Sequence, residues 1–188
     1  MAETLLPETF RKSSEKIVSY SWEDLASGQS YLTFYLIQVA GTTYKLVNNA
    51  TATNTPYIED SGTAYTFSSS VFTTPRVIYG MAMLETAHRI IASGTVRNIT
   101  INGVLKLNST TIGTFTQITD SAGSDVQFTG CSTCDIPLTQ VKVGDILNLE
   151  ITVGGSTEVP VYMYIDPQIT TAGALGTSKL YVPFKIQE

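Results

Sequence analysis

Cys131 and Cys134 are separated by two residues, a spacing found in redox pairs, in halves of metal sites and in local disulfides. A redox pair of this kind normally opens a helix, whereas Gly130 before the motif and Pro137 after it indicate a turn between strands. A zinc site would need two further ligands, and the chain has a single histidine. We therefore expect ordinary thiols, or a disulfide between Cys131 and Cys134 or between subunits, with a metal or redox site as the alternative.

His88 is the other side chain suited to acid–base chemistry, and Glu85 precedes it by three residues. A hydrolase needs a histidine within reach of a nucleophile and oriented by an acid. The sequence has no nucleophile elbow of the G-x-S-x-G kind. We therefore expect His88 to be a packing or surface residue, and we expect no catalytic residue.

Carboxylates are spread along the chain at positions that read as turns, where such side chains accept hydrogen bonds from the backbone. These residues are Glu59, Asp60, Asp120, Asp125, Asp135, Asp145 and Asp166. A calcium site in a loop is the alternative, but the spacing of an EF-hand does not occur. We expect turn chemistry, with no bound metal and no cofactor.

The elements that would position these residues are strands, and the clearest of them lie between residues 96 and 118. Ile99, Ile101 and Leu105 share one face, while polar residues occupy the other, which is typical of a half-buried strand. A turn at Asn108-Ser109 keeps the apolar residues of both strands on one face.

This register places Leu105 opposite Ile112 and Ile99 opposite Ile118. We interpret Gly103 as a bulge or as a position where another part of the chain approaches closely.

A second alternating pattern runs from residue 141 to 165. After the Gly144-Asp145 turn, an apolar residue recurs at every second position from Leu147 to Val153. The pattern resumes at residue 159 after Gly154-Gly155, which predicts another hairpin.

The remaining strands follow the same logic, and clusters of Gly, Asn, Asp, Ser and Pro separate them. The expected strands are 31–39, 42–47, 64–67, 76–84, 96–107, 110–118, 126–129, 146–153, 159–165 and 180–186. Residues 76–91 are more continuously apolar and predict a central strand buried on both faces, with a continuation into a short irregular or helical piece as the alternative. Residues 48–63 and 166–178 predict long loops. The expected fold is an all-β, antiparallel two-sheet sandwich.

Composition supports this fold class and limits the partners. Threonine is the commonest residue and favours strands, and only 14% of the 188 residues are charged. So few charges leave apolar surface that contacts between subunits could cover. The net charge of −5 argues against nucleic-acid and membrane-surface binding.

Residues 1–20 differ from the rest, because they are richer in charge and lack strand alternation. They also carry apolar side chains that suit contact with a partner, namely Leu5, Leu6, Phe10, Ile17 and Val18. We expect an extended N-terminal arm over 1–20 and a single β-sandwich domain over 21–188, with a frayed terminus as the alternative. The N-terminus shows no secretory signal pattern, so synthesis in a cytoplasm is expected.

Three segments together resemble the jelly-roll domains of virion structural proteins from viruses and tailed phages. They are residues 97–108, residues 112–116 and the segment Val141-Lys-Val-Gly-Asp-Ile-Leu-Asn-Leu-Glu-Ile151. The resemblance extends over about residues 30–186 and implies a jelly-roll-like sandwich. A similar strand start also occurs in trimeric C1q-like and carbohydrate-binding jelly rolls.

The resemblance implies a non-enzymatic capsid decoration or cement protein that acts in the virion after assembly in the host cytoplasm. Its expected partners are copies of itself, as a homotrimer, and other virion proteins such as a major capsid protein. The alternative is a receptor- or glycan-binding module of a phage fibre or tail that uses the 48–63 and 166–178 loops.

Overall fold

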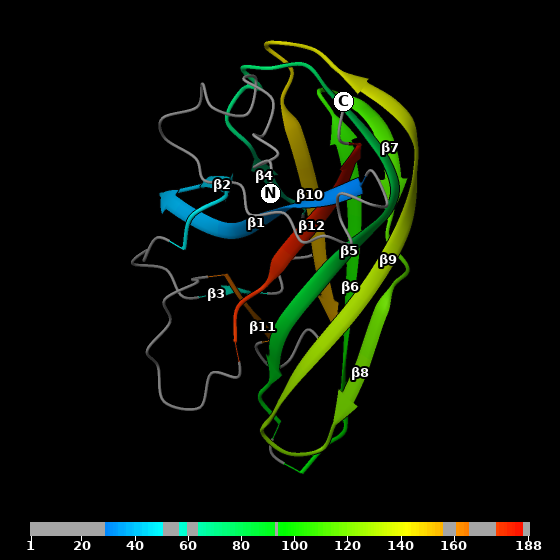
Figure 1. The fold of residues 1–188 in the computed structure, drawn as a ribbon. Helices are drawn as coiled ribbons and strands as arrows, with labels where there is room; N and C mark the ends of the chain where they lie inside the picture. Colours follow the sequence, from blue (N-terminus) through cyan, green and yellow to red (C-terminus); the bar gives the residue numbers. More distant parts are fainter. Residues whose placement is uncertain are drawn as a thin grey trace, which may run out of the picture.

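The computed structural model describes residues 29–50, 57–59, 64–92, 94–155, 161–165 and 176–185, and these residues form twelve strands (Figure 1). The strands are β1 (Gln29–Ala40), β2 (Thr43–Val47), β3 (Tyr57–Glu59), β4 (Ala64–Ser68), β5 (Arg76–Ile90), β6 (Arg97–Leu107), β7 (Thr110–Thr114), β8 (Ile118–Ala122), β9 (Val126–Val141), β10 (Leu147–Gly155), β11 (Val161–Tyr164) and β12 (Lys179–Lys185). Within this part of the chain no helix is long and apolar enough to cross a membrane. The all-β prediction is confirmed.

The strands belong to one hydrogen-bonded sheet in the order β3-β11-β5-β12-β1-β2-β4-β10-β6-β7. Two further strands pair off this path, β8 with β6 and β9 with β5. The pairing of β2 with β4 is parallel, whereas the other pairings are antiparallel. The expectation of purely antiparallel pairing in two sheets is therefore wrong at the level of hydrogen bonds, because β2 and β4 connect the strands into one mixed sheet.

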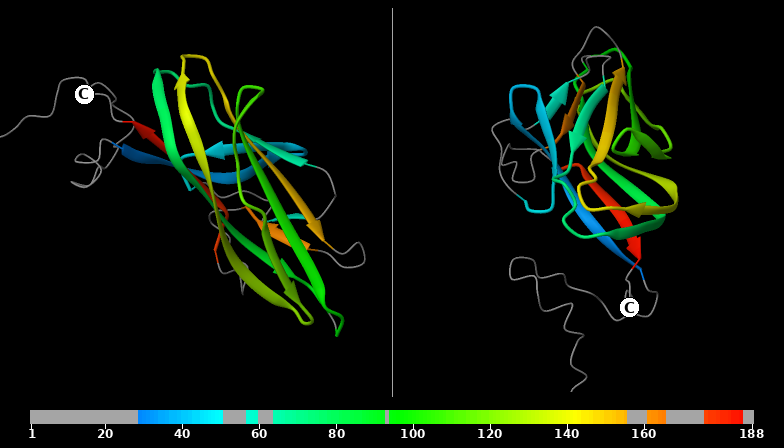
Figure 2. Two further views of the ribbon diagram at one scale, coloured as in Figure 1. Left: turned by 90° about the vertical axis from the view of Figure 1, so that its right-hand side faces the viewer. Right: turned by 90° about the horizontal axis from the view of Figure 1, so that it is seen from above.

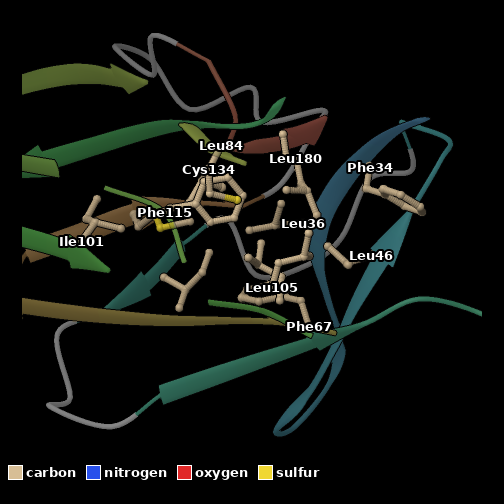
Figure 3. Packing of buried hydrophobic residues seen from close by; sticks show 14 of the residues in the cluster. Phe34, Leu36, Leu46, Phe67, Leu84, Ile101, Leu105, Phe115, Cys134 and Leu180 are labelled. Atoms are coloured by element: carbon tan, nitrogen blue, oxygen red, sulfur yellow. The ribbon is translucent and has the colours of Figure 1, made fainter. Parts of the chain in front are cut away.

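This sheet curls around a single core, so that β6 and its neighbours face β5 and β9 (Figure 2). Leu84 of β5 and Ile101 of β6 are both buried in the same apolar cluster. Their side chains extend into the space between the curled strands, with Phe115, Cys134 and Leu180 close by (Figure 3). Burial of this cluster supplies the main favourable free energy of folding, because apolar area leaves water.

Strand β5 is central to this arrangement. One of its edges pairs with β9 along the whole strand, and the other edge pairs with β12 and then with β11. Even-numbered side chains from Ala82 to Ile90 are buried, as the alternation of a strand requires. The prediction of a central strand beginning at Arg76 is confirmed, and it continues as a strand through Ile90 rather than changing to an irregular or helical piece. The expected burial of both faces is wrong near the start of the strand, where Tyr79 and Met81 are exposed.

The hairpin predicted for residues 96–118 forms with its turn at Asn108-Ser109, where Asn108 has a φ of 54°. The predicted register is wrong beyond the first two pairs. A bulge places Leu105 opposite Gly113, and Ile118 begins a separate strand opposite Ile101. The bulge at Leu105 and the break between β7 and β8 each shift the pairing with β6 by one residue from the predicted register.

Gly103 is a close-approach position, as predicted. A Cβ atom there would lie 3.0 Å from side-chain atoms of Leu84 and Phe115. The absence of a side chain lets β6 approach the facing strand.

The second predicted hairpin is wrong in its pairing. Leu147, Leu149, Ile151 and Val153 are buried as expected, but β10 pairs with β4 and β6. Strand β11 instead pairs with β3 and β5. Two neighbouring alternating segments can each pair with distant strands when those strands offer a better apolar face.

Two other expectations are corrected. Residues 57–59 form β3 inside the segment predicted as a loop, and β9 extends to Val141 rather than ending near residue 129. Most of the 166–178 loop and the whole 1–20 arm, with Leu5, Leu6, Phe10, Ile17 and Val18, lie outside the described residues.

The close packing of the facing strands predicts the effect of Gly130→Ala. A Cβ atom at this position of β9 would lie 2.9 Å from both Ile118 Cγ2 and Thr86 Oγ1. We expect the free energy of unfolding to fall by about 1–3 kcal/mol, the usual cost of overpacking. Urea denaturation monitored by circular dichroism measures it.

Gly123→Ala is the matched control, because its Cβ would meet Val96 Cγ2 at an ordinary 3.6 Å. Its stability should change by no more than about 0.5 kcal/mol. Equal effects of the two substitutions would contradict the packing.

Candidate functional site

His88 lies between the facing strands and is fully buried. Its Nε2 atom is 2.8 Å from Asp120 Oδ2 of β8, and its Nδ1 atom is 3.3 Å from Thr86 Oγ1. The ring stacks on Phe128 of β9 with 5.6 Å between the ring centroids. The histidine thus joins three strands, β5, β8 and β9.

The hydrogen bonds assign the tautomer of His88. An ionised carboxylate can only accept a hydrogen bond, so the Nε2 atom of His88 carries the hydrogen and donates a hydrogen bond to Asp120. Nδ1 then accepts from the Thr86 hydroxyl. Burial lowers the pKa of His88 below its usual 6.5, and the hydrogen bond and charge of Asp120 partly oppose this shift.

Thr86, His88 and Asp120 have the residue types of a nucleophile–base–acid triad, but their placement does not suit catalysis. The Thr86 side chain is buried, and Gly130 packs against its hydroxyl. A nucleophile must reach a substrate carbonyl, and this hydroxyl has no route to one. The group acts as a polar connection between facing strands, in agreement with the packing role expected for His88. Glu85 is three residues from His88 on the same strand and therefore points to the opposite face, where it accepts a hydrogen bond from Tyr181 Oη at 2.9 Å.

The two cysteines lie in the middle of β9, not in a turn between strands as predicted. Cys131 is exposed and Cys134 is buried, and both are free thiols. Residues three apart on a strand point to opposite faces and have Cα atoms about 10 Å apart, beyond the reach of a disulfide. Of the expected alternatives, the ordinary thiols agree with this fold, whereas a disulfide between Cys131 and Cys134 does not. Burial raises the pKa of Cys134 to about 11.

Of the acidic residues predicted to lie in turns, Asp60 and Asp166 lie outside the described residues, and Asp120 and Asp135 lie in β8 and β9 rather than in turns. Asp145 accepts hydrogen bonds from Asn108 Nδ2 at 2.9 Å and from the Lys142 amide at 2.7 Å, which closes the turn before β10 and holds its pKa below the usual value. Asp125 pairs with Arg89. Among the described residues, no group of three or more His, Cys, Asp or Glu side chains could hold a metal ion.

A cavity of about 440 Å³ opens at the other end of β5, and sequence reasoning did not find it. Its lining comes from three segments, residues 31–34 of β1, residues 46–49 at and just after the end of β2, and residues 69–74 with Arg76. The parallel pairing of β2 and β4 explains this grouping. Parallel strands end at the same edge of a sheet, so Asn48 and Asn49 lie beside Ser69 and Ser70.

The segment between β4 and β5 is held against the turn that precedes β10. The Phe72 amide donates to the Asp145 carbonyl at 2.9 Å, and the Gly144 amide donates to the Phe72 carbonyl at 2.9 Å. Ser69 Oγ also accepts from the Leu147 amide at 3.1 Å. This wall of the cavity is therefore fixed before any ligand arrives.

The outer face of the sheet carries exposed apolar side chains in one row, which we call the outer row. It consists of Tyr31, Tyr79, Met81 and Leu138, which are 49%, 48%, 54% and 66% exposed. Tyr79 and Met81 are two residues apart on the same side of β5, and Leu138 lies in the stretch of β9 opposite Ile78 and Gly80. Tyr31 pairs with Pro183 of β12, the strand between β1 and β5. The pairing of β5 with β9 is irregular between Ile78 and Gly80, next to this row, and Gly80 there has a positive φ of 106°.

Comparison with known proteins shows similarity in fold alone. No family model and no curated protein matches the sequence. A CocE/NonD family hydrolase from Staphylococcus aureus is similar in structure, with a TM-score of 0.59 and 10% identity over 83% of this chain and 37% of that chain. An aminopeptidase from a marine sediment Thaumarchaeota archaeon has a TM-score of 0.54 at 6% identity, over 85% of this chain and 37% of that one. An α-amino acid ester hydrolase has a TM-score of 0.51 at 9% identity, over 82% and 36%. The chain thus corresponds to little more than a third of each of these proteins.

The burial of His88 predicts a specific pH dependence of stability. Its folded-state pKa is lowered, so the unfolded chain takes up a proton first as the pH falls below about 6.5. The free energy of unfolding should therefore be constant between about pH 7 and 8 and decrease as the pH falls from about 6.5 to 5. Urea titrations at several pH values measure this slope.

The His88→Gln variant can still donate to Asp120 but cannot titrate, so its stability should change little over the same interval. An identical slope in both proteins would show that His88 is not the group responsible.

Proposed function

We propose that this chain is a non-enzymatic structural protein of a virion, a decoration protein that docks onto copies of itself and onto a shell. The resemblance of residues 97–108, 112–116 and 141–151 to jelly-roll virion proteins supports the class. The curled all-β sheet is compatible with a jelly-roll-like sandwich, which we propose as the finer fold. The expected assembly is a homotrimer bound to other virion proteins, with the 1–20 arm as a further contact.

The outer row is the observation that carries this proposal. Four large side chains, each about half exposed or more, lie together on one face of the sheet. Contiguous exposed apolar surface is typical of protein interfaces. Covering this row with a second copy would remove its apolar area from water and stabilise the assembly.

A receptor- or glycan-binding module is the second candidate, and the cavity favours it. Asn48 and Asn49, at the start of the segment predicted to carry recognition, line its edge. The similar solved structures are hydrolases, but they share only the fold, and Thr86 and His88, which would be the nucleophile and the base, are fully buried. We therefore do not propose hydrolysis.

Substitution of the outer row tests the structural proposal. We expect the wild-type chain to be an oligomer by native mass spectrometry and by light scattering after gel filtration. Met81→Lys combined with Leu138→Lys should raise the dissociation constant at least tenfold, because two charges would enter a desolvated contact.

Val96→Lys is the matched control, since Val96 is 67% exposed and lies outside the outer row. It should leave the oligomer unchanged. A wild-type monomer at every concentration, or an oligomer that tolerates the double substitution, would contradict the proposal.

A further inference from the structure

We propose that the cavity at the start of β5 binds a short acidic saccharide, one that carries a carboxylate. This inference rests on the second candidate function, the recognition module, and names its ligand class. It does not require the outer row to form an interface, although Tyr31 belongs to both the outer row and the cavity lining.

Arg76 supplies the charge selectivity. It is the first residue of β5, it lines the cavity, and its guanidinium carbon lies 5.2 Å from the ring centroid of the buried Phe184. The cavity lining contains no Asp or Glu, and Arg76 makes no ion pair with the described residues. A half-buried cation with an aromatic face on one side and no carboxylate partner favours an anionic ligand.

The planar guanidinium favours a carboxylate among anions, because its parallel N–H groups match two carboxylate oxygens. The proposed contact is therefore bidentate, with the carboxylate of the sugar facing Arg76.

The rest of the rim suits hydroxyl groups. Five of the polar side chains of the lining are amides or hydroxyls, which can both donate and accept hydrogen bonds. They are Asn48, Asn49, Ser70, Thr73 and Thr74. A ligand rich in hydroxyls can satisfy such a rim, whereas an apolar acid would leave it unpaired.

Apolar side chains complete the cavity. Phe34 and Leu46 belong to the core or its border, and Phe72 is partly buried against it. Tyr31 adds a half-exposed ring at the edge. Aromatic and apolar side chains beside a few polar groups are the usual composition of a small-ligand site, and 440 Å³ lies within the usual range of about 300–1,000 Å³.

The cavity also has a prearranged wall, which favours binding. The hydrogen bonds that join Phe72 to Asp145 and Gly144 hold the segment between β4 and β5 in place. A ligand therefore does not have to order this segment, and the entropic cost of binding is smaller.

The test is titration of the full chain with three probes, oligogalacturonate, its neutral galactose counterpart and inorganic phosphate. Calorimetry measures affinity, and NMR shifts of the Asn48, Asn49 and Thr73 amides locate the site. We expect oligogalacturonate to bind at least tenfold more tightly than the neutral sugar. Arg76→Gln should remove this preference.

Lys142→Gln is the matched control, because it removes one positive charge from an exposed residue outside the cavity lining. It should preserve the preference. Arg76→Lys keeps the charge but loses the bidentate geometry, so it should give an intermediate affinity. Unchanged thermal unfolding of each variant shows that the fold is retained.

Each remaining outcome overturns the proposal in a distinguishable way. Equal binding of both sugars, unaffected by Arg76→Gln, would reject acid selectivity and leave the recognition module intact. Binding of phosphate without binding of oligogalacturonate would assign a general oxyanion site. No binding of either sugar would reject both this inference and the glycan-recognition candidate.

Discussion

The inward face of β5 and the strands that pair with it are the constraint on which the rest of the structure depends. A strand of fifteen residues spans about 50 Å, and its two edges are occupied by β9 on one side and by β12 and β11 on the other. Its inward side chains must be covered, and the curl of the sheet brings β6, β8 and β10 over them. The approach is close because Gly103 and Gly130 have no side chains at the points of contact.

His88 and Arg76 are both polar side chains on the inward face of β5. Their different environments follow from whether other strands cover the face at that point. His88 lies near the end of β5, where β8 and β9 enclose it, so its ring is neutral and fully hydrogen-bonded. Arg76 lies at the start of the same strand, where it lines the cavity between β1, the end of β2 and the segment before β5. The same alternation that points both residues inward gives one a structural role and leaves the other available to a ligand.

The sequence predicts local features well, because they depend on neighbouring residues. The alternation of β6 and β10, the turn at Asn108 and the close approach at Gly103 all follow from period, turn chemistry and side-chain size. The length of β9 was missed because Gly130, Cys131 and Pro137 resemble a turn, whereas pairing with β5 holds them in a strand. The parallel pairing of β2 with β4 joins segments with no local signal, so the cavity between their ends could not be predicted. The His88–Asp120 contact spans 32 residues and was hidden for the same reason.

Native-state amide hydrogen exchange tests the central role of β5 most directly, because it ranks the strands by the free energy needed to open them. If β5 organises the sheet, the amides of Ala82, Leu84 and Thr86 will exchange only through global unfolding. The amides of β3 and β7, at the ends of the strand order, will exchange through smaller openings. Faster exchange in β5 than in those end strands would contradict the central role of this strand and the arrangement of His88 and Arg76 along it.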